Sequence, residues 1–132
     1  MPRVSVLLPV RDAAATLGAC LDSLAAQTLA DHEVVAVDDG SRDGSGEILR
    51  ARGGEDPRLR VFPGPRRGLV SALNRALAEA RAPLVARMDA DDVVRSERLL
   101  LPAERLERDA AVDVLGCRVR LAGAGAGEGM RA

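Results

Sequence analysis

Short Val- and Leu-rich runs alternate with longer amphipathic segments along most of the chain, and this alternation constrains the fold most. The runs "VSVLLPV" at 4–10 and "EVVAV" at 33–37 are almost wholly apolar, as are strands covered on both faces. Each precedes a segment with apolar residues three or four apart, the pattern of a helix that buries one side. Strands alternating with helices pair in parallel through right-handed crossovers, so we predict an α/β fold with a doubly wound, mostly parallel sheet.

The same patterns predict individual elements. We expect strands at 4–10, 33–37, 58–62, 84–88 and 112–119, and the strand at 84–88 is taken as buried. Helices are expected from about residue 14 to 27 and then after residues 45, 68 and 96. The sequence assigns residues 1–121 to one domain and the Gly- and Ala-rich residues 122–132 to a loop or tail.

Three features of the expected helices can be tested directly. The apolar face of the third helix is predicted to hold Leu69, Leu73, Ala76, Leu77 and Ala80. Asp43 or Ser45 is expected to cap the second helix. Pro102 is expected to kink or restart the fourth helix, since an interior proline costs roughly 3 kcal/mol.

Composition narrows the functional classes. The net charge of the 132 residues is -1, with both signs interspersed, so we expect neither nucleic acid nor a membrane surface as partner. Every basic side chain is Arg, which excludes a P-loop lysine and Schiff-base chemistry. No apolar run approaches the ~20 residues of a membrane span.

Two cysteines and one histidine have ordinary interpretations. Cys20 and Cys117 lie far apart without CxxC spacing, so we expect reduced thiols, packed as small apolar side chains, and a cytoplasmic location. His32 stands between polar residues and is expected at the surface without a special role.

Polar clusters follow three of the predicted strands, at residues 9–11, 38–41 and 89–92. In open α/β sheets ligands bind beyond the carboxyl ends of the strands. We therefore expect the three clusters to converge on one crevice.

The stretch "RMDADD" at 87–92 places three carboxylates, Asp89, Asp91 and Asp92, within four residues. Like charges this close repel unless a positive partner holds them. A hard divalent cation such as Mg²⁺ or Mn²⁺ would be such a partner, and it could also take phosphate oxygens of a nucleotide diphosphate. The alternative is that the aspartates are solvated loop residues or helix caps.

The stretch "VDDGS" at 37–41 ends the second predicted strand. A carboxylate here suits hydrogen bonding to a base or ribose, and alternatively the stretch is a turn with an N-cap. If Asp39 binds a nucleotide, we expect its replacement by Ala to weaken binding and leave thermal stability nearly intact.

Taken in order, these motifs resemble a known family. The segments "VSVLLPVRDAAATLGACLDSLAAQTLADHEVVAVDDGSRDGSGEIL", "RRGLVSALNRALAEARAPLVARMDADD", "ERL" and "VDVLGCRV" are similar to the nucleotide-binding half of family 2 glycosyltransferases with the GT-A fold. The resemblance covers about residues 4–119. It implies a nucleotide-diphosphate sugar donor, a divalent metal, inversion at the anomeric carbon, and a glycan or lipid-linked acceptor in the synthesis of polysaccharides or cell-surface glycans.

The resemblance also assigns roles to individual positions. It implies a base pocket with Pro9 and Arg11, where members often carry Tyr in place of Arg11. It implies that Asp39 reads the base, with Asp38 beside it. Asp89 would face the ribose or donor sugar, and Asp91 would hold the metal. Arg87 could pair with a neighbouring aspartate or with the diphosphate.

Two parts of the family pattern have no counterpart in the sequence: the carboxylate that acts as catalytic base and the acceptor motif. We therefore expect a partial glycosyltransferase domain with no identifiable catalytic residue, inactive by itself and able to self-associate through an apolar sheet edge. The alternatives are a non-catalytic nucleotide-sugar binding fragment or degenerate remnant, and, less favoured, a metal-dependent nucleotidyltransferase.

Overall fold

The computed structural model describes residues 1–120 and 130–131. The described elements, in chain order, are β1 (Val4–Val10), α1 (Ala14–Ala25), β2 (His32–Asp38), α2 (Ser45–Glu55), β3 (Leu59–Pro63), α3 (Leu69–Glu79), β4 (Leu84–Arg87), α4 (Leu100–Arg108), β5 (Val119–Arg120) and β6 (Met130–Arg131). No helix among the described residues combines the length and apolarity needed to cross a membrane.

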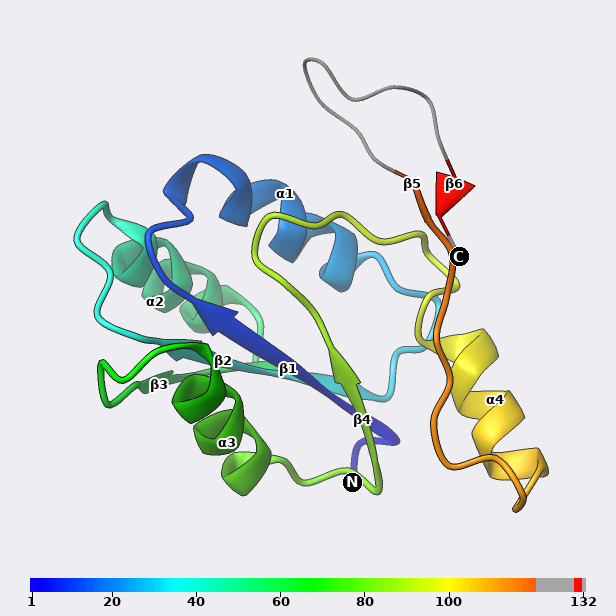
Figure 1. Cartoon of the computed structure of the whole chain (residues 1–132). Helices are drawn as coiled ribbons and strands as arrows, with labels where there is room; N and C mark the ends of the chain where they lie inside the picture. Colours follow the sequence, from blue (N-terminus) through cyan, green and yellow to red (C-terminus); the bar gives the residue numbers. More distant parts are fainter. Residues whose placement is uncertain (121–129, 132) are drawn as a thin grey trace.

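Four parallel strands form the main sheet, in the order β3-β2-β1-β4 (Figure 1). Strand β1 lies between β2 and β4, and its register pairs Val10 with Asp38 at the carboxyl ends of β1 and β2. The predicted parallel α/β sheet is confirmed.

The sheet has helices on both faces (Figure 1). Leu17 of α1, Leu49 of α2 and Ala103 of α4 share the larger hydrophobic cluster with one face of β1 and β2. The other face packs its own cluster against α3, through Ala72 and Ala76. The even-numbered residues of β1 face the first cluster, as the period of two in a strand requires.

Strand β4 is an edge strand, which corrects the expectation of a buried one. Val85 and Arg87 have exposed side chains, and Leu84 and Ala86 are only partly buried. An arginine within the sheet is tolerated here because this face of β4 meets solvent.

The strand predicted at 112–119 does not form. Residues 112–118 have no strand or helix, and Val119–Arg120 pairs only with Met130–Arg131, in an antiparallel ladder. Val114 is 86% exposed. An apolar run becomes a strand only when it pairs with a neighbouring strand, and this segment instead runs past α4 (Figure 1). Of the predicted tail, residues 122–129 and 132 lie outside the described part, as does residue 121 before it.

Helices α3 and α4 differ from their predicted forms. The side chains that α3 buries are Ala72 and Ala76, with Leu73 partly buried, while Leu69 and Leu77 are about half exposed. Small residues let the helix approach the sheet closely. Helix α4 begins at Leu100, so Pro102 lies in its first turn, where a missing N–H costs nothing and no kink is needed.

His32 is buried, contrary to the expectation of a surface residue. Its Nδ1 lies 2.7 Å from the carbonyl oxygen of Leu29. Because a carbonyl only accepts, Nδ1 carries the proton of the neutral ring. Burial lowers the pKa of His32, so this neutral form is favoured. Cys20 is buried as predicted, whereas Cys117 is exposed.

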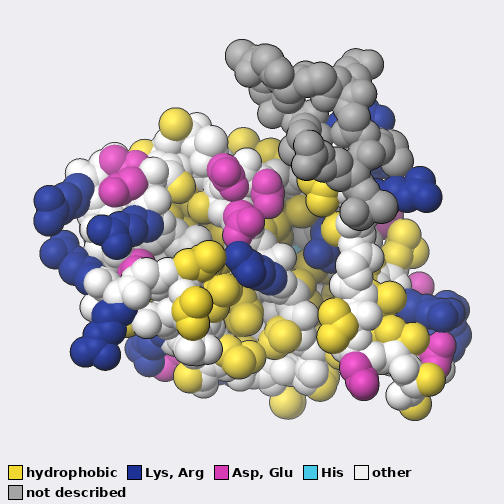
Figure 2. Space-filling view, viewed as in Figure 1, with side chains coloured by type: hydrophobic (Ala, Val, Ile, Leu, Met, Phe, Trp, Pro, Cys, Tyr) yellow, Lys and Arg dark blue, Asp and Glu magenta, His cyan; other side chains and the backbone are white. Residues whose placement is uncertain are grey.

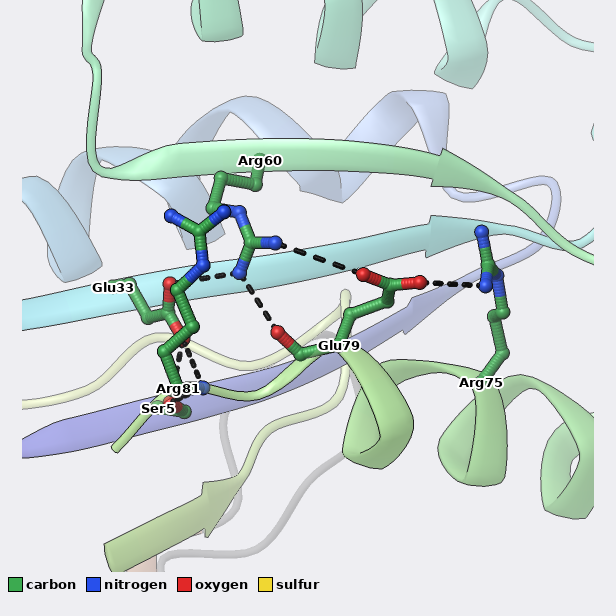
Figure 3. A network of polar contacts seen from close by, with 6 residues as sticks. All are labelled: Ser5, Glu33, Arg60, Arg75, Glu79 and Arg81. Atoms are coloured by element: carbon green, nitrogen blue, oxygen red, sulfur yellow. Dashed lines mark hydrogen bonds and ion pairs between the residues drawn. The ribbon is translucent and has the colours of Figure 1, made fainter. Parts of the chain in front are cut away.

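A polar network closes the α3 face at the amino-terminal end of the sheet (Figure 3). Glu33 is buried and accepts hydrogen bonds from Ser5 Oγ (2.7 Å), Arg60 (3.0 Å) and the Arg81 N–H (2.8 Å). Burial alone would raise the pKa of Glu33, but these hydrogen bonds outweigh it and lower the pKa. Arg60 also donates to the carbonyl of Glu79 at the end of α3, so the network joins three strands to this helix.

Candidate functional site

A cleft of about 550 Å³ opens beyond the carboxyl ends of β1, β2 and β4. Its volume is within the range of small-molecule sites. Its lining comprises Pro9, Val10, Arg11, Asp12, Ala13, Ala15, Thr16, Asp39, Asp43, Gly68, Leu69, Ala72, Asp89, Ala90 and Asp91. The three clusters that the sequence placed at strand ends therefore meet in one cleft.

The loops after β1 and β2 are bonded to one another on one side of this cleft. The Asp12 N–H donates to Ser41 Oγ (3.0 Å), and the Arg42 N–H donates to Asp12 (2.7 Å). Asp43 accepts from the Ala14 N–H (2.9 Å) in the first turn of α1. These bonds fix the backbone around Arg11, which is itself exposed.

The predicted cap of α2 is only partly right. The N-cap position is Gly44, whose φ of 93° is readily adopted by glycine, and it makes no side-chain cap bond. Asp43 nevertheless accepts from both the N–H (3.1 Å) and the Oγ (2.7 Å) of Ser45. The Ser45 hydroxyl bond, ahead of the backbone bond from Ala14, holds the pKa of Asp43 below its usual value.

Asp39 lines the cleft, yet its carboxylate also holds the protein together. Its side chain is 2% exposed and accepts the backbone N–H groups of Arg66 (2.7 Å) and Gly68 (3.0 Å). These two bonds fix the loop that leads into α3. Because these bonds tie a buried charge to the backbone, loss of this carboxylate should lower stability, which corrects the expectation that Asp39→Ala leaves thermal stability nearly intact.

Asp38 points elsewhere. Its Oδ1 accepts the Ser41 N–H (3.0 Å), and its Oδ2 lies so close to Gly46 in α2 that an added Cβ there would stand 2.6 Å away. Asp38 is not among the lining residues of the cleft. Its contacts belong to the turn after β2, and a role in nucleotide binding stays a prediction.

The loop between β4 and α4, residues 88–99, is called the acidic loop here. Its carboxylates Asp89, Asp91 and Asp92 are exposed, and each offers an oxygen within 4.8 Å of the others. Burial, followed by the charges of Asp91 and Asp89, raises the pKa of Asp92. Arg87 lies 3.7 Å from Asp89, which is one of the two pairings expected for it. Figure 2 shows acidic side chains gathered in the middle of the face that also presents exposed hydrophobic side chains.

Sequence reasoning missed several parts of the cleft. Thr16 on α1 and Gly68, Leu69 and Ala72 at the start of α3 all line it. The loop "PGPRRG" before α3 was the available signal, because the amino-terminal end of α3 reaches the same edge as the carboxyl ends of the strands. Gly40 makes the bend after Asp39 with a φ of 84°, and the Arg66 side chain lies directly over it.

Comparison with known proteins identifies the family. A family model described as glycosyl transferase family 2 matches residues 5–128. The chain belongs to this family. It is 36% identical over 117 residues to the uncharacterized glycosyltransferase EpsJ of Bacillus subtilis, an alignment that covers 89% of this chain and 34% of EpsJ.

Two solved structures show the same architecture. TarS of S. aureus, residues 1–349 with UDP-GlcNAc, superposes with a TM-score of 0.74 at 28% identity, over 82% of this chain and 32% of that one. The mannosyltransferase PcManGT of Pyrobaculum calidifontis, with GDP-Man and Mn²⁺, gives a TM-score of 0.63 at 34% identity, over 70% and 28%. This family 2 chain thus spans about a third of the length of these relatives.

Proposed function

We propose that the chain is the donor-binding part of a glycosyltransferase that takes a sugar from a nucleotide diphosphate and transfers it, with inversion, to a glycan or lipid-linked acceptor. The observation that carries this proposal is the convergence of Asp39, Asp89 and Asp91 in one cleft at the carboxyl edge of the sheet. Two structural neighbours are complexes with nucleotide sugars, UDP-GlcNAc and GDP-Man. The products we expect are polysaccharides or cell-surface glycans.

The acidic loop suits a hard divalent cation, Mg²⁺ or Mn²⁺. Three carboxylate oxygens close together and open to solvent form the donor set that such ions prefer, with coordination positions left for phosphate oxygens. We assign Asp91 as metal ligand, with Asp89 next to it facing the ribose or the donor sugar. A bound cation would offset the charge that builds up on the diphosphate leaving group.

The opposite side of the cleft suits the nucleotide base. Pro9 lies near the end of β1 and Arg11 directly follows the strand there, and a guanidinium can stack on a base. The two oxygens of Asp39 already accept one backbone N–H each, but a carboxylate has about four acceptor positions, so it could also accept from a base or ribose. Asp38 would act indirectly, by holding the turn at Ser41.

No residue is assigned as catalytic base. An inverting transfer needs a base within hydrogen-bond reach of the acceptor hydroxyl. The carboxylates in the cleft are committed to the backbone or to the proposed cation, so we expect these residues alone to transfer no sugar. We also propose a cytoplasmic location, which accords with two cysteines that are both free thiols.

Calorimetry with UDP and GDP, with and without Mn²⁺, tests the proposal. Wild-type chain should bind a nucleotide diphosphate more tightly when Mn²⁺ is present, and Asp91→Ala should lose that enhancement. Asp109→Ala is the matched control, because Asp109 is an aspartate that caps the carboxyl end of α4 and does not line the cleft. Equal binding by Asp91→Ala and wild type in Mn²⁺ would remove Asp91 as metal ligand. Metal-dependent sugar transfer to a saccharide or lipid acceptor by these residues alone would show that a base is present.

A further inference from the structure

The acidic loop has no helix or strand of its own, yet it must hold three carboxylates together. We propose that helix α1, which ends at Ala25, and the residues that directly follow it form a template that holds this loop in its cation-binding shape, with Thr16 and Gln27 as positioning residues. This inference rests on the proposed metal site.

The contacts follow one side of the helix. Thr16, Cys20 and Ser23 are spaced by four and three residues, which places them in a row on α1, and Gln27 is the second residue after the helix ends at Ala25. Each forms a hydrogen bond with the backbone of the acidic loop. Thr16 donates to the carbonyl of Ala90 (3.0 Å), and Cys20 to that of Asp89 (3.7 Å, from sulfur). Ser23 accepts the N–H of Val94 (3.2 Å), and Gln27 donates to the carbonyl of Arg95 (2.7 Å). Thr28 adds two bonds to the carbonyl of Ser96, from its N–H (2.8 Å) and its Oγ1 (3.0 Å).

Gln27 makes the most specific of these contacts. Its Nε2 donates to the carbonyl of Arg95, and its Oε1 accepts the N–H of Leu99 (3.0 Å). The two partners differ in kind, so only one orientation of the amide satisfies both. Gln27 is buried and does not line the cleft, so it can reach a ligand only through the loop.

Thr16 acts at the other end of the loop. Its hydroxyl donates to the carbonyl of Ala90, the residue between Asp89 and Asp91. Ala90 and Leu99 are themselves buried in the same hydrophobic cluster as Leu17 and Leu24 of α1. The loop is thus held by Thr16 of α1 at one end, by Gln27 just after α1 at the other, and by apolar contacts beside them.

A template is needed because the three carboxylates of the loop repel one another in the shape that binds a cation. Carboxylates with oxygens within 4.8 Å repel one another until a cation arrives. If the loop were free to spread, the carboxylates would have to come together before each cation bound. The affinity for the cation would then fall in proportion to the fraction of molecules in which they are already together. Hydrogen bonds to a rigid helix keep that fraction high.

The test measures binding of Mn²⁺ alone, by electron paramagnetic resonance, at a temperature where circular dichroism shows each variant folded. Gln27→Met keeps the length of the side chain and removes both bonds to the loop, together with the bond that Gln27 Nε2 donates to the Ser23 carbonyl (3.1 Å). Thr16→Val removes the hydroxyl, whereas Thr16→Ser retains it. Ser5→Ala is the control, since it deletes a hydroxyl that is far from the acidic loop and buried at the amino-terminal end of the sheet (Figure 3). Amide exchange at Val94 and Leu99 reports the loop without metal.

We expect Gln27→Met and Thr16→Val to weaken Mn²⁺ binding by up to about tenfold, the worth of roughly one hydrogen bond. Gln27→Met should also speed exchange at Leu99. Thr16→Ser should retain most of the affinity, and Ser5→Ala should bind Mn²⁺ as wild type does.

Wild-type affinity in both Gln27→Met and Thr16→Val would overturn the template, as would an equal loss in Ser5→Ala. Should Gln27→Met fail to fold, the two Thr16 variants decide in the same way. A wild-type chain that takes up no Mn²⁺ would instead refute the metal site of the proposed function, and the positioning role would be refuted with it.

Discussion

Asp39→Ala is expected to destabilise the fold as well as to weaken ligand binding. The carboxylate is buried at the end of β2 and accepts two backbone N–H groups, from Arg66 and Gly68. Removing it leaves both donors without their partner in a loop packed closely against it. An added Cβ on Gly64 in that loop would stand only 2.6 Å from Asp39 Oδ1.

The size of the effect follows from those two bonds. A hydrogen bond to a charged group contributes about 1.5–3 kcal/mol, so two give an upper limit of roughly 3–6 kcal/mol. Because the loop lies at the surface, water can reach the freed donors, and we expect a loss of about 2–4 kcal/mol in the free energy of unfolding. For a chain of this size that corresponds to a fall in Tm of roughly 8–16 °C.

Urea denaturation of Asp39→Ala, Asp39→Asn and Asp38→Ala would measure this. The Asn variant keeps one acceptor and should lose less stability, and Asp38→Ala, which gives up one bond to Ser41, should lose least. Nucleotide binding is then measured where every variant is folded. A midpoint for Asp39→Ala within experimental error of wild type would refute the reasoning, since the two bonds would then contribute nothing.

Three further outcomes are expected. The pKa of Glu33 is lowered in the folded protein, so the Glu33 carboxylate contributes stability above its unfolded pKa of about 4.3, and this contribution is lost as pH falls through the folded pKa. Urea midpoints below pH 5 should therefore fall less steeply with pH for Glu33→Gln than for wild type. Burial, with the charges of the acidic loop, raises the pKa of Cys20 to about 12. A thiol reagent should therefore modify exposed Cys117 in the native protein and Cys20 only after unfolding. Rapid labelling of both cysteines in the native protein would contradict the burial of Cys20. Among the described residues nothing pairs with the outer edge of β4, beside half-exposed Val85, so the chain should self-associate there. Sedimentation should then show a species larger than one chain that Val85→Glu reduces, and a wild-type monomer at all concentrations would count against it.

The sequence by itself determined the parallel sheet and the position of the cleft. The runs that became β1 and β2 are buried almost throughout, because a strand at the centre of an α/β sheet is covered on both faces and can carry apolar side chains at every position. Once those strands are parallel, their carboxyl ends share one edge. Polar residues after β1, β2 and β4 must then meet there, whatever the details of packing.

Tertiary structure decided everything that depends on which neighbour a residue finds. The run at 112–119 is apolar enough for a strand, yet residues 112–118 pair with no strand in the described structure and run past α4 instead. Leu69 and Leu77 have helical periodicity, but Ala72 and Ala76 contact the sheet. Asp38 and Asp39 are adjacent in sequence and point to different places, one to the turn before α2 and one to the loop before α3. Periodicity indicates which side of an element is apolar, whereas the partner of each side chain is set by contacts between residues far apart in the chain.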